Sequence, residues 1–452
     1  MNIRNIKRFF GLFVLAFLIV FIVVIIRLPQ NDDKNIIVTD NDLLIPDPDT
    51  ATDPGHEVVI EPETIPEVVT EPEPQRLEPI SLVDEEMPAS LLPIAKQYNV
   101  IGMSIAVIEN GEVTHSYVFG DQQKATDTSE AIPYTSDSVI RVAGVSELVS
   151  AIGVMSLCES GKLDLDRPIG DYLGYPVKNP KSDSEITLRQ LMTHTAGVSD
   201  SGAYNDVVYG RTKYQLLKNM LTGENAKKNF YSYKAGYSYD FSNFGSAMMG
   251  CIVSSVAGKS FNEFMKSDIF TPLAIDAGYY STEIENRSNI ATIYLRNEVN
   301  YVLEEMDGFA VEMESVDDVD NYRISHGNLF ISTAGLSRIA QLLLNKGSLG
   351  TVSVLSEESV ENMLSTEAKG TLYKDVGAGL CVTRKKDIVD GRVLYGHGGI
   401  AYGATAEIFF DPTDNTAVII TCNGGNLSTD DSGFSSMAKA FIQEIYASII
   451  GK

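Results

Sequence analysis

The sequence has no tryptophan, only four cysteines among 452 residues, and too few basic residues to balance its acidic ones. Four cysteines cannot form the framework of a disulfide-rich fold. Lys and Arg total 35 against 61 Asp and Glu, a formal charge of −26, and this field repels nucleic-acid phosphates. We therefore exclude a nucleic-acid partner. The hydrophobic content of 44 % suffices for a sizeable core, in about two or three folding units or one large domain with appendages.

The cysteines also lack the spacing of a metal or redox site. Cys158, Cys251, Cys381 and Cys422 lie far apart in apolar runs, with no Cys-x-x-Cys and no His-Glu-x-x-His in the chain. We predict buried free thiols, no metal site and no cofactor. A Cys381–Cys422 bridge between neighbouring strands is the alternative.

The N-terminal 30 residues have the pattern of a membrane anchor. Residues 9–26 are eighteen uncharged, almost wholly apolar residues, and they follow three of the four bases in residues 1–30. At ~1.5 Å per residue such a helix just crosses a bilayer. The positive charge before the helix predicts a cytoplasmic N-terminus and export of the rest to the outer side of the cell membrane. A cleaved signal peptide is the alternative, although its apolar part is normally ~7–15 residues and ends at small residues.

The next segment is acidic and rich in proline. Residues 31–80 contain 14 acids, two bases and eight prolines. Like charges repel, prolines stiffen the chain, and few apolar side chains are present to offset the entropy of ordering. We predict a disordered stalk over 31–85 and one domain over 86–452.

The domain begins with a predicted hairpin and continues with helical patterns. Strands at 101–108 and 113–119 flank Glu109-Asn110-Gly111, a strong turn signal. Apolar residues spaced as on one face of a helix predict an amphipathic helix over 145–158. Further elements are predicted as helices at 187–193, 244–257, 334–346 and 434–449 and as strands at 405–410 and 417–422. Strands at both ends of the domain around a helix-rich middle predict an α/β (α+β) fold, an antiparallel sheet flanked by helices, with a helical insertion.

Six stretches in order resemble the serine beta-lactamase and penicillin-binding protein superfamily, in the branch of class C beta-lactamases, D,D-peptidases and related esterases. They start at Ser138 (Ser-Val-Ile-Arg-Val-Ala-Gly-Val-Ser-Glu), Glu159 (Glu-Ser-Gly-Lys-Leu-Asp-Leu-Asp-Arg-Pro), Ile186 (Ile-Thr-Leu-Arg-Gln-Leu-Met-Thr-His-Thr-Ala-Gly), Tyr239 (Tyr-Asp-Phe-Ser-Asn-Phe-Gly), Ser332 (Ser-Thr-Ala-Gly-Leu-Ser-Arg-Ile-Ala) and Tyr395 (Tyr-Gly-His-Gly-Gly). The resemblance covers residues 88–450 and implies a beta-lactamase/transpeptidase-like fold.

The resemblance also shows what is missing. In the family an acylated Ser and a Lys three residues later share one face of a helix N-terminus. Here the matching positions are Gly144 and Glu147, which supply neither a nucleophile nor a base. A relocated nucleophile is the alternative. Ser146, however, is rotated by ~200° from Gly144, and Ser150 lies one turn deeper.

The second family motif is altered and the third is kept. The Tyr of Tyr-x-Asn, whose hydroxyl shuttles a proton, is replaced by Phe241, while Asn243 remains. For Tyr237 and Tyr239 we predict surface or packing roles. The third motif survives as a predicted cleft wall of His397, Gly398 and Gly399.

The other histidines carry weaker predictions. We interpret His194 as a structural loop residue because it lies within Thr193-His194-Thr195 of a family motif. His56, His115 and His326 receive no assignment.

These losses predict a membrane-anchored, extracytoplasmic pseudoenzyme, because removing a catalytic serine alone costs on the order of 10⁶ in rate. Its remaining cleft would bind a peptidoglycan stem peptide, or a protein of the envelope would dock elsewhere on a scaffold whose cleft is vestigial. An active serine hydrolase of unfamiliar design is the alternative.

Overall fold

The computed structural model describes residues 76–224, 226–296, 303–305, 320–365, 368 and 376–451. Residues 71–452 form one compact unit. No helix within the described ranges is both long and apolar enough to cross a membrane. The anchor predicted at 9–26 and most of the predicted stalk lie outside the described residues.

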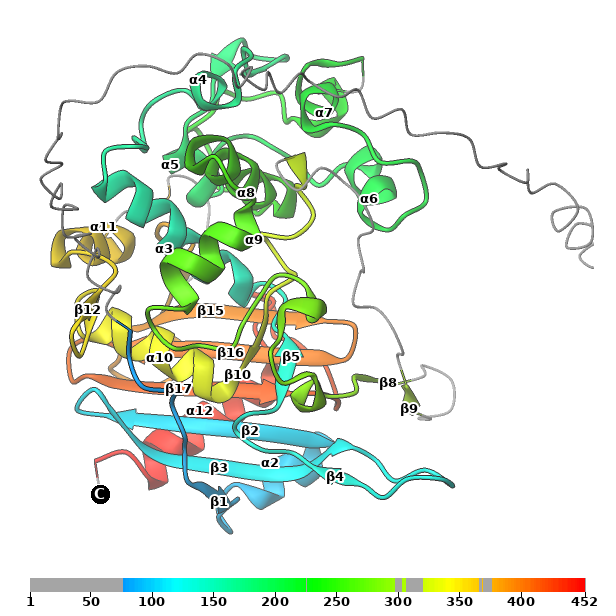
Figure 1. The fold of residues 1–452 in the computed structure, drawn as a ribbon, viewed down its shortest axis with the longest axis vertical. Coiled ribbons are helices and arrows are strands. Elements are labelled where there is room, and N and C mark those ends of the chain that lie inside the picture. Colours follow the sequence, from blue (N-terminus) through cyan, green and yellow to red (C-terminus); the bar gives the residue numbers. More distant parts are fainter. Residues whose placement is uncertain are drawn as a thin grey trace, which may run out of the picture. The chain divides into compact units, whose positions relative to one another are not determined.

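One large sheet carries the domain (Figure 1). Its strands follow the order β1 (Asp84–Glu86), β3 (Glu112–Gln123), β2 (Gly102–Glu109), β17 (Thr416–Cys422), β16 (Ala404–Asp411), β15 (Leu394–Ala401), β14 (Thr383–Lys385) and β13 (Val376–Ala378), with β4 (Ile132–Pro133) on β3. All pairs are antiparallel except β1 with β3, which is parallel. The sheet is therefore mixed, whereas the sequence predicted an antiparallel one.

The predicted hairpin is confirmed. β2 and β3 are joined through Asn110 and Gly111, with φ angles of 54° and 82°. Positive φ at both central residues is the geometry that matches the twist of the flanking strands, and Asn-Gly adopts it at low cost. The strands predicted at 405–410 and 417–422 are likewise confirmed as β16 and β17.

The predicted helices are also confirmed, and shorter ones complete the fold. The helices are α2 (Leu92–Gln97), α3 (Val145–Glu159), α4 (Ile169–Leu173), α5 (Leu188–Met192), α6 (Gly202–Val208), α7 (Leu217–Thr222), η1 (Ala226–Asn229), α8 (Asn243–Ala257), α9 (Phe261–Phe264), the π-helical turn η2 (Met265–Phe270), η3 (Ser281–Glu283), η4 (Arg287–Asn289), α10 (Thr333–Leu344), α11 (Glu357–Ser365) and α12 (Ser436–Ser448). Short two-stranded pairs are β5 (Val139–Arg141) with β10 (Phe330–Ser332), β6 (Lys178–Asn179) with β7 (Ser184–Glu185), β8 (Tyr294–Arg296) with β9 (Leu303–Glu305), and β11 (Ser348–Leu349) with β12 (Val352–Ser353).

Both faces of the sheet are covered, which gives the domain two cores. α2 and α12 pack on one face, with Phe409 and Val418 pointing toward them. α3 and α10 pack on the other face, with Ile408 and Ile419 pointing toward them. Because neighbouring residues of a strand face opposite sides, β16 and β17 contribute to both cores.

Helix α3 lies between the sheet and the insertion formed by α4 to α9 (Figure 1). Twelve of its 15 residues are buried, so the helix is covered on all sides rather than amphipathic as predicted. It contacts β15 on one side and α8 on the other. Polar side chains on α3 must therefore find their partners inside the protein.

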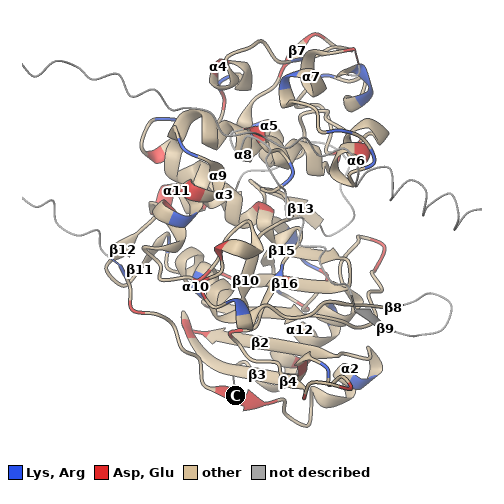
Figure 2. Cartoon of the chain, turned by 45° about the vertical axis from the view of Figure 1, so that its right-hand side comes forward, with Lys and Arg blue, Asp and Glu red and all other residues tan. Residues whose placement is uncertain are grey.

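The insertion has its own charge balance. Residues 169–264 contain ten Lys and Arg against eight Asp and Glu, although the whole chain carries a formal charge of −26. Figure 2 shows basic positions around α6 and α7. This part of the surface is thus mildly basic in an acidic protein.

The domain includes residues before 86, the position predicted as its boundary. The backbone N–H of Leu77 donates to the carbonyl of Pro272 at 2.9 Å, and Arg338 donates to the carbonyl of Glu78. β1 then joins the sheet beside β3. The last part of the predicted stalk therefore belongs to the domain, because its backbone finds hydrogen-bond partners there.

The cysteines are free, as predicted. Cys251, Cys381 and Cys422 are buried and Cys158 is half-buried. Burial raises the pKa of the Cys422 thiol to about 12, and the thiol hydrogen-bonds to the carbonyl of Gly424. The alternative Cys381–Cys422 bridge is wrong, because each sulfur packs against a different neighbour.

Candidate functional site

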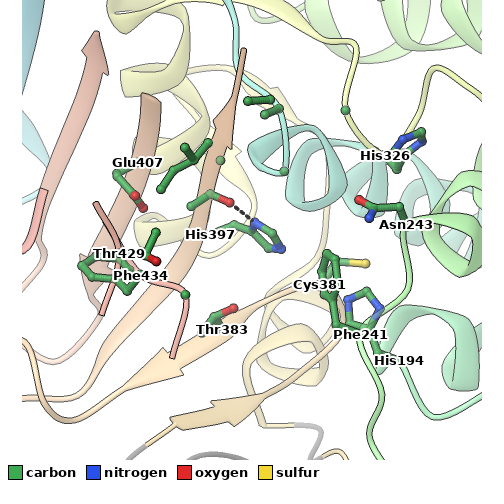
Figure 3. A pocket seen from close by; sticks show the side chains of 18 of the residues that line it. His194, Phe241, Asn243, His326, Cys381, Thr383, His397, Glu407, Thr429 and Phe434 are labelled. Carbon is green, nitrogen blue, oxygen red and sulfur yellow. Dashed lines mark hydrogen bonds between the residues drawn. The ribbon is translucent and has the colours of Figure 1, made fainter. Parts of the chain in front are cut away.

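A cavity of about 940 Å³ lies between the edge of the sheet at β15 and the helical insertion (Figure 3). Six of the seven residues singled out in the sequence line it, namely Gly144, Phe241, Asn243, His397, Gly398 and Gly399. The seventh, Glu147, is fully buried behind the wall. The structure thus brings the three altered or retained motifs together at one place.

Gly144 stands at the N-cap of α3, where the resemblance implies the nucleophilic serine, and β15 lies directly against it. A Cβ atom at residue 144 would lie 2.7 Å from the carbonyl oxygen of Gly398 and 3.2 Å from Cε1 of His397. A Cβ atom at residue 399 would lie 2.2 Å from the carbonyl oxygen of Val142. Backbone therefore packs on backbone here, and the space that a serine side chain needs is occupied by the strand.

Glu147 lies one turn into α3 and contacts residues from two elements of the insertion, α8 and the turn after α5. Its Oε2 accepts a hydrogen bond from the Ser246 hydroxyl of α8 at 2.8 Å. Nε2 of His194, in the turn after α5, lies 3.3 Å from the same oxygen. The N–H of Ser242 donates to Nδ1 of His194, so the ring proton sits on Nε2 and points at the carboxylate. The sequence predicted only a structural loop role for His194, but the structure places it in the site, where it contacts Glu147 and lines the cavity.

His397 completes the surroundings of Glu147 from β15. Its Nδ1 lies 2.9 Å from the carbonyl of Gly398, which can only accept, and its Nε2 lies 3.9 Å from Oε2 of Glu147. Burial lowers the pKa of His397, although Glu147 acts in the opposite direction. The neutral ring then turns an unprotonated Nε2 toward the carboxylate.

The carboxyl group of Glu147 is ionised despite its burial. Burial alone raises the pKa of Glu147, but the hydrogen bonds from His194 and Ser246 outweigh it and lower the pKa. Oε1 has no hydrogen-bond partner among the described residues. The position that carries a catalytic cation in the family thus holds a buried anion that ties α3, α8 and the α5 turn together.

Phe241 keeps the ring of the family tyrosine and uses it for packing. It is 46 % exposed on the cavity wall, and its ring centroid lies 4.7 Å from that of His194. Tyr239 also lines the cavity, with its ring edge against His194 at 5.7 Å. The predicted surface or packing role of Tyr239 misses this inward position, because the chain turns at Asp240, whose N–H donates to the His194 carbonyl. Tyr237 is 72 % exposed, as predicted.

Asn243 lines the cavity but part of its amide is already used. Its Nδ2 donates to Oδ2 of Asp200 at 2.6 Å, and its backbone N–H donates to the same oxygen at 3.0 Å. The other oxygen of Asp200 accepts from the Ser242 hydroxyl and from the N–H of Phe244. Asp200 therefore caps α8 and fixes Asn243 at its first turn.

The hydroxyls considered as substitutes for the nucleophile are engaged elsewhere. Ser146 accepts from the N–H of Leu329, and Ser150 donates to the carbonyl of Ser325. Both serines are fully buried and outside the cavity lining. Cys381 does line the cavity, but burial and the Glu147 charge raise the pKa of its thiol well above the ordinary value, so the nucleophilic thiolate is disfavoured.

Of the two unassigned histidines that the structure describes, His326 lies at the site and His115 does not. It lines the cavity, its Nδ1 has no partner within the described part of the chain, and burial lowers its pKa. His115 pairs with Glu85 on β3 and β1, and His56 lies outside the described residues. Within the described ranges, no group of three His, Cys, Asp or Glu residues is placed to hold a metal ion.

Two buried charged residues of the cavity wall were not predicted from the sequence. Glu407 of β16 and Lys385 of β14 are 1 % and 2 % exposed. The signal for Glu407 was available, because a single acid interrupts the apolar run from Ala404 to Phe410. Such an acid in a strand that is buried on both faces is costly and therefore informative.

The cavity wall also concentrates unusual backbone. Four residues other than glycine line it with positive φ angles, namely Ala143, His194, Cys381 and Tyr402, at 46°, 51°, 53° and 51°. Each costs of order 1–3 kcal/mol, and such residues cluster at functional sites.

Comparisons with known proteins agree with this geometry. The sequence model of the family described as "Beta-lactamase" matches residues 82–439. "Penicillin-binding protein 4" of Amycolatopsis lactamdurans is 23 % identical over 369 residues, which cover 79 % of this chain and 86 % of that protein. A "putative D-alanyl-D-alanine carboxypeptidase" of Escherichia coli O157:H7 is 20 % identical over 350 residues, covering 71 % and 78 %.

Solved structures share the fold at low identity. The D-amino acid amidase from Ochrobactrum anthropi SV3 superimposes with a TM-score of 0.63 at 18 % identity, over 80 % of this chain and 99 % of that one. The octameric penicillin-binding protein homologue from Pyrococcus abyssi gives a TM-score of 0.61 at 20 % identity, over 79 % and 75 %. On the extent of the family match, this chain belongs to the beta-lactamase family.

Proposed function

We propose that this protein is a catalytically silent member of its family that binds a cell-wall peptide in the cavity. One observation carries the proposal: the cavity stays open at about 940 Å³ while the place of the nucleophile is closed, with the Gly398 carbonyl 2.7 Å from where a Cβ of residue 144 would lie. Without a nucleophile, acyl transfer slows by on the order of 10⁶. A pocket with strained walls, in which the described residues include no activated nucleophile, suits recognition better than turnover.

A peptide with a free carboxyl end suits the charges around the cavity. Two guanidinium groups line it, those of Arg141 and Arg323, each stacked on a tyrosine ring at 4.7 Å. The insertion beside them is mildly basic. The Escherichia coli O157:H7 relative is named a "putative D-alanyl-D-alanine carboxypeptidase", so we take an acyl-D-Ala-D-Ala peptide as the first ligand to test.

The competing function is an active hydrolase with a relocated nucleophile. Ser432 lines the cavity, and Lys385 Nζ lies 2.6 Å from its Oγ. The hydroxyl, however, donates to Oδ1 of Asp430 at 2.6 Å, so the ammonium acts as donor and not as base. A serine held in this way lacks the unprotonated amine that activates a nucleophile.

We also propose that a membrane helix at 9–26 anchors the domain outside the cell. The proposal rests on the sequence alone. Protease added to intact cells should then digest the domain while an N-terminal tag stays protected. Digestion of the tag without cell lysis would contradict the proposed orientation.

Covalent labelling tests the absence of acyl transfer. The full-length protein is incubated with a fluorescent penicillin and separately with a fluorophosphonate, and its intact mass is measured. We expect no adduct. An adduct, on Ser432 or elsewhere, would overturn the proposal, and the labelled residue would be the nucleophile.

Ligand binding tests the cavity itself, with a blocked variant and a matched control. Gly327 lines the cavity and has no atom within 4 Å of a Cβ built on it, so Gly327→Trp adds a large side chain at the cavity wall. Gly202, equally open but outside the cavity lining, provides the control Gly202→Trp. We expect the peptide to bind wild type and the control but not the blocked variant. Equal capture of an envelope protein by all three would indicate a scaffold with a vestigial cleft.

A further inference from the structure

Glu407 lies on the opposite face of the sheet from His397, although both line the cavity. On β15 and β16, His397 pairs with Ile408 and Gly398 pairs with Glu407, and successive residues face opposite sides. A Cβ at residue 398 would lie 2.3 Å from Oε2 of Glu407, so the carboxyl group covers Gly398. The cavity therefore passes around the edge of β15, which β14 pairs only as far as Gly396.

The part of the cavity beyond this edge is a polar recess with aromatic walls. In Figure 3, Glu407, Thr429 and Phe434 lie on one side of His397, and His194, Phe241 and His326 on the other. We call this part the rear lobe, lined by Thr383, Lys385, Glu407, Phe409, Thr429, Ser432 and Phe434. Thr429 is exposed and Thr383 and Ser432 are half-buried, so solvent reaches the lobe there.

Oε2 of Glu407 is the unsatisfied group of the rear lobe. It is buried and has no hydrogen-bond partner in the described part of the chain. A buried polar atom without a partner costs about 1–3 kcal/mol, so the protein tolerates a loss of stability here. Oε2 lies against Gly398, and the Glu407 side chain also lines the cavity, so a ligand that reaches the carboxyl group from the rear lobe would supply the missing partner.

The charges around Glu407 favour a cationic ligand. Lys385 lies 3.3 Å from Asp387 and donates to Ser432, while Lys439 lies 3.0 Å from Asp387 and 3.6 Å from Asp430. The two lysines are therefore neutralised by the two aspartates. An ionised Glu407 adds one uncompensated negative charge, which an anionic ligand would worsen and a single ammonium would balance.

The walls favour an alkyl chain before that ammonium. The rings of Phe409 and Phe434 meet edge to face with centroids 5.2 Å apart. Aromatic rings provide apolar surface for methylene groups. We propose that the rear lobe binds a primary alkylammonium group, with Glu407 as its counter-ion and the two phenylalanines around its methylene chain. That a peptide carries this ammonium group rests on the proposed function.

Binding then releases a proton. Burial raises the pKa of Glu407 well above its ordinary value, opposed by Lys385 and supported by Asp430, so the empty lobe holds the neutral acid. When the ammonium enters, the carboxyl O–H bond breaks, the electron pair stays on the oxygen, and the proton leaves to buffer. The ligand keeps all its protons and pairs with the carboxylate.

A small probe tests the lobe independently of any peptide. Thermal unfolding of the full-length protein is measured with n-butylammonium chloride, with n-butanol and with sodium chloride, for wild type and Glu407→Gln. The amide is nearly isosteric, and Glu361→Gln on the exposed face of α11 is the matched control. We expect the ammonium, but not butanol, to raise the Tm of wild type and the control, and to leave Glu407→Gln unchanged. An equal shift in all three proteins, or none in wild type, would overturn the inference.

A pair of peptides then separates the two proposals. Acetyl-Lys-D-Ala-D-Ala and its norleucine analogue are titrated calorimetrically in buffers of different ionisation enthalpy. We expect the lysine peptide to bind wild type at least tenfold more tightly, with release of about one proton, and the preference to vanish in Glu407→Gln. Equal binding of both peptides, with no effect of the ammonium probe, refutes the rear-lobe inference alone. If the ammonium probe acts but neither peptide binds, the proposed peptide ligand is wrong and the rear-lobe inference stands.

Discussion

Replacing Gly144 with alanine tests whether β15 has taken the place of the nucleophile. Gly144 has φ −58° and ψ −22°, ordinary helical values that alanine adopts without strain. A Gly→Ala change at such a position normally stabilises a protein by about 0.4–1 kcal/mol, because the unfolded chain loses freedom. Any loss of stability must therefore come from the added methyl group.

The structure predicts such a loss. The new Cβ would lie 2.7 Å from the Gly398 carbonyl oxygen and 3.2 Å from Cε1 of His397, and the first contact is with backbone that cannot rotate away. Overpacking of this kind costs about 1–3 kcal/mol. Subtracting the gain in the unfolded state leaves a net destabilisation of about 1–2 kcal/mol. Gly144→Ser should lose at least as much, because its hydroxyl needs still more space.

Gly245 in the first turn of α8 is the matched control. The nearest atom to its added Cβ is Cβ of Ser242 at 3.6 Å, an ordinary contact. Gly245→Ala should therefore gain about 0.5–1 kcal/mol. Urea denaturation of the two variants and wild type gives the free energies of unfolding. A Gly144→Ala protein as stable as Gly245→Ala would show that β15 does not close the site.

Three further predictions concern the buried titratable groups. Glu147→Gln should lower the free energy of unfolding, measured by urea denaturation, by about 1–3 kcal/mol, because the hydrogen bonds of Ser246 and His194 lose their charged acceptor. A change under about 0.5 kcal/mol would contradict the inference that the carboxylate holds α3, α8 and the α5 turn together. Burial lowers the pKa of His326 and His397, so below their ordinary value of 6.5 the unfolded chain binds protons that the folded chain does not. The Tm should therefore fall as the pH drops from 7 to 5. A constant Tm over this range would contradict this prediction. Burial raises the pKa of Glu407 above its ordinary 4.5, so the folded state holds a proton that the unfolded state loses as pH rises. Glu407→Gln should therefore stabilise the ligand-free protein more at pH 8 than at pH 4. Equal effects at both pH values would count against a neutral buried acid.

Local patterns predicted the fold well where neighbouring residues decide the structure. The Asn110-Gly111 turn sets the first hairpin, and the apolar spacing of 145–158 sets α3. The parallel strand β1 was not predicted, because three acidic residues, Asp84 to Glu86, carry no strand pattern. What orders them lies elsewhere in the chain: Ser116 donates to the Asp84 carboxylate at 2.8 Å, and the N–H of Ser136 donates to its other oxygen.

The sequence predicted the positions of the site residues but not the contacts that they make. Alignment to motifs located Gly144, Glu147 and Phe241, since a motif fixes where a residue stands. It did not show that Glu147 would meet Ser246, which lies 99 residues away in sequence. A first-turn acid is usually solvated and stabilised by the helix dipole, whereas this one is sealed in by the insertion. Burial and long-range pairing depend on the whole fold, so no local pattern carries them.

The three altered positions are best understood as one rebuilt core, because each missing reactive group is matched by a packing or hydrogen-bonding contact. The glycine at 144 admits β15, Glu147 gathers Ser246 and His194, and the Phe241 ring rests on that same histidine. Restoring the family residue at one position alone does not restore the chemistry. A lysine at 147 would face His194 and His397, with no nucleophilic serine at 144 to activate. Hydrolysis would therefore need all three changes together with an outward shift of β15.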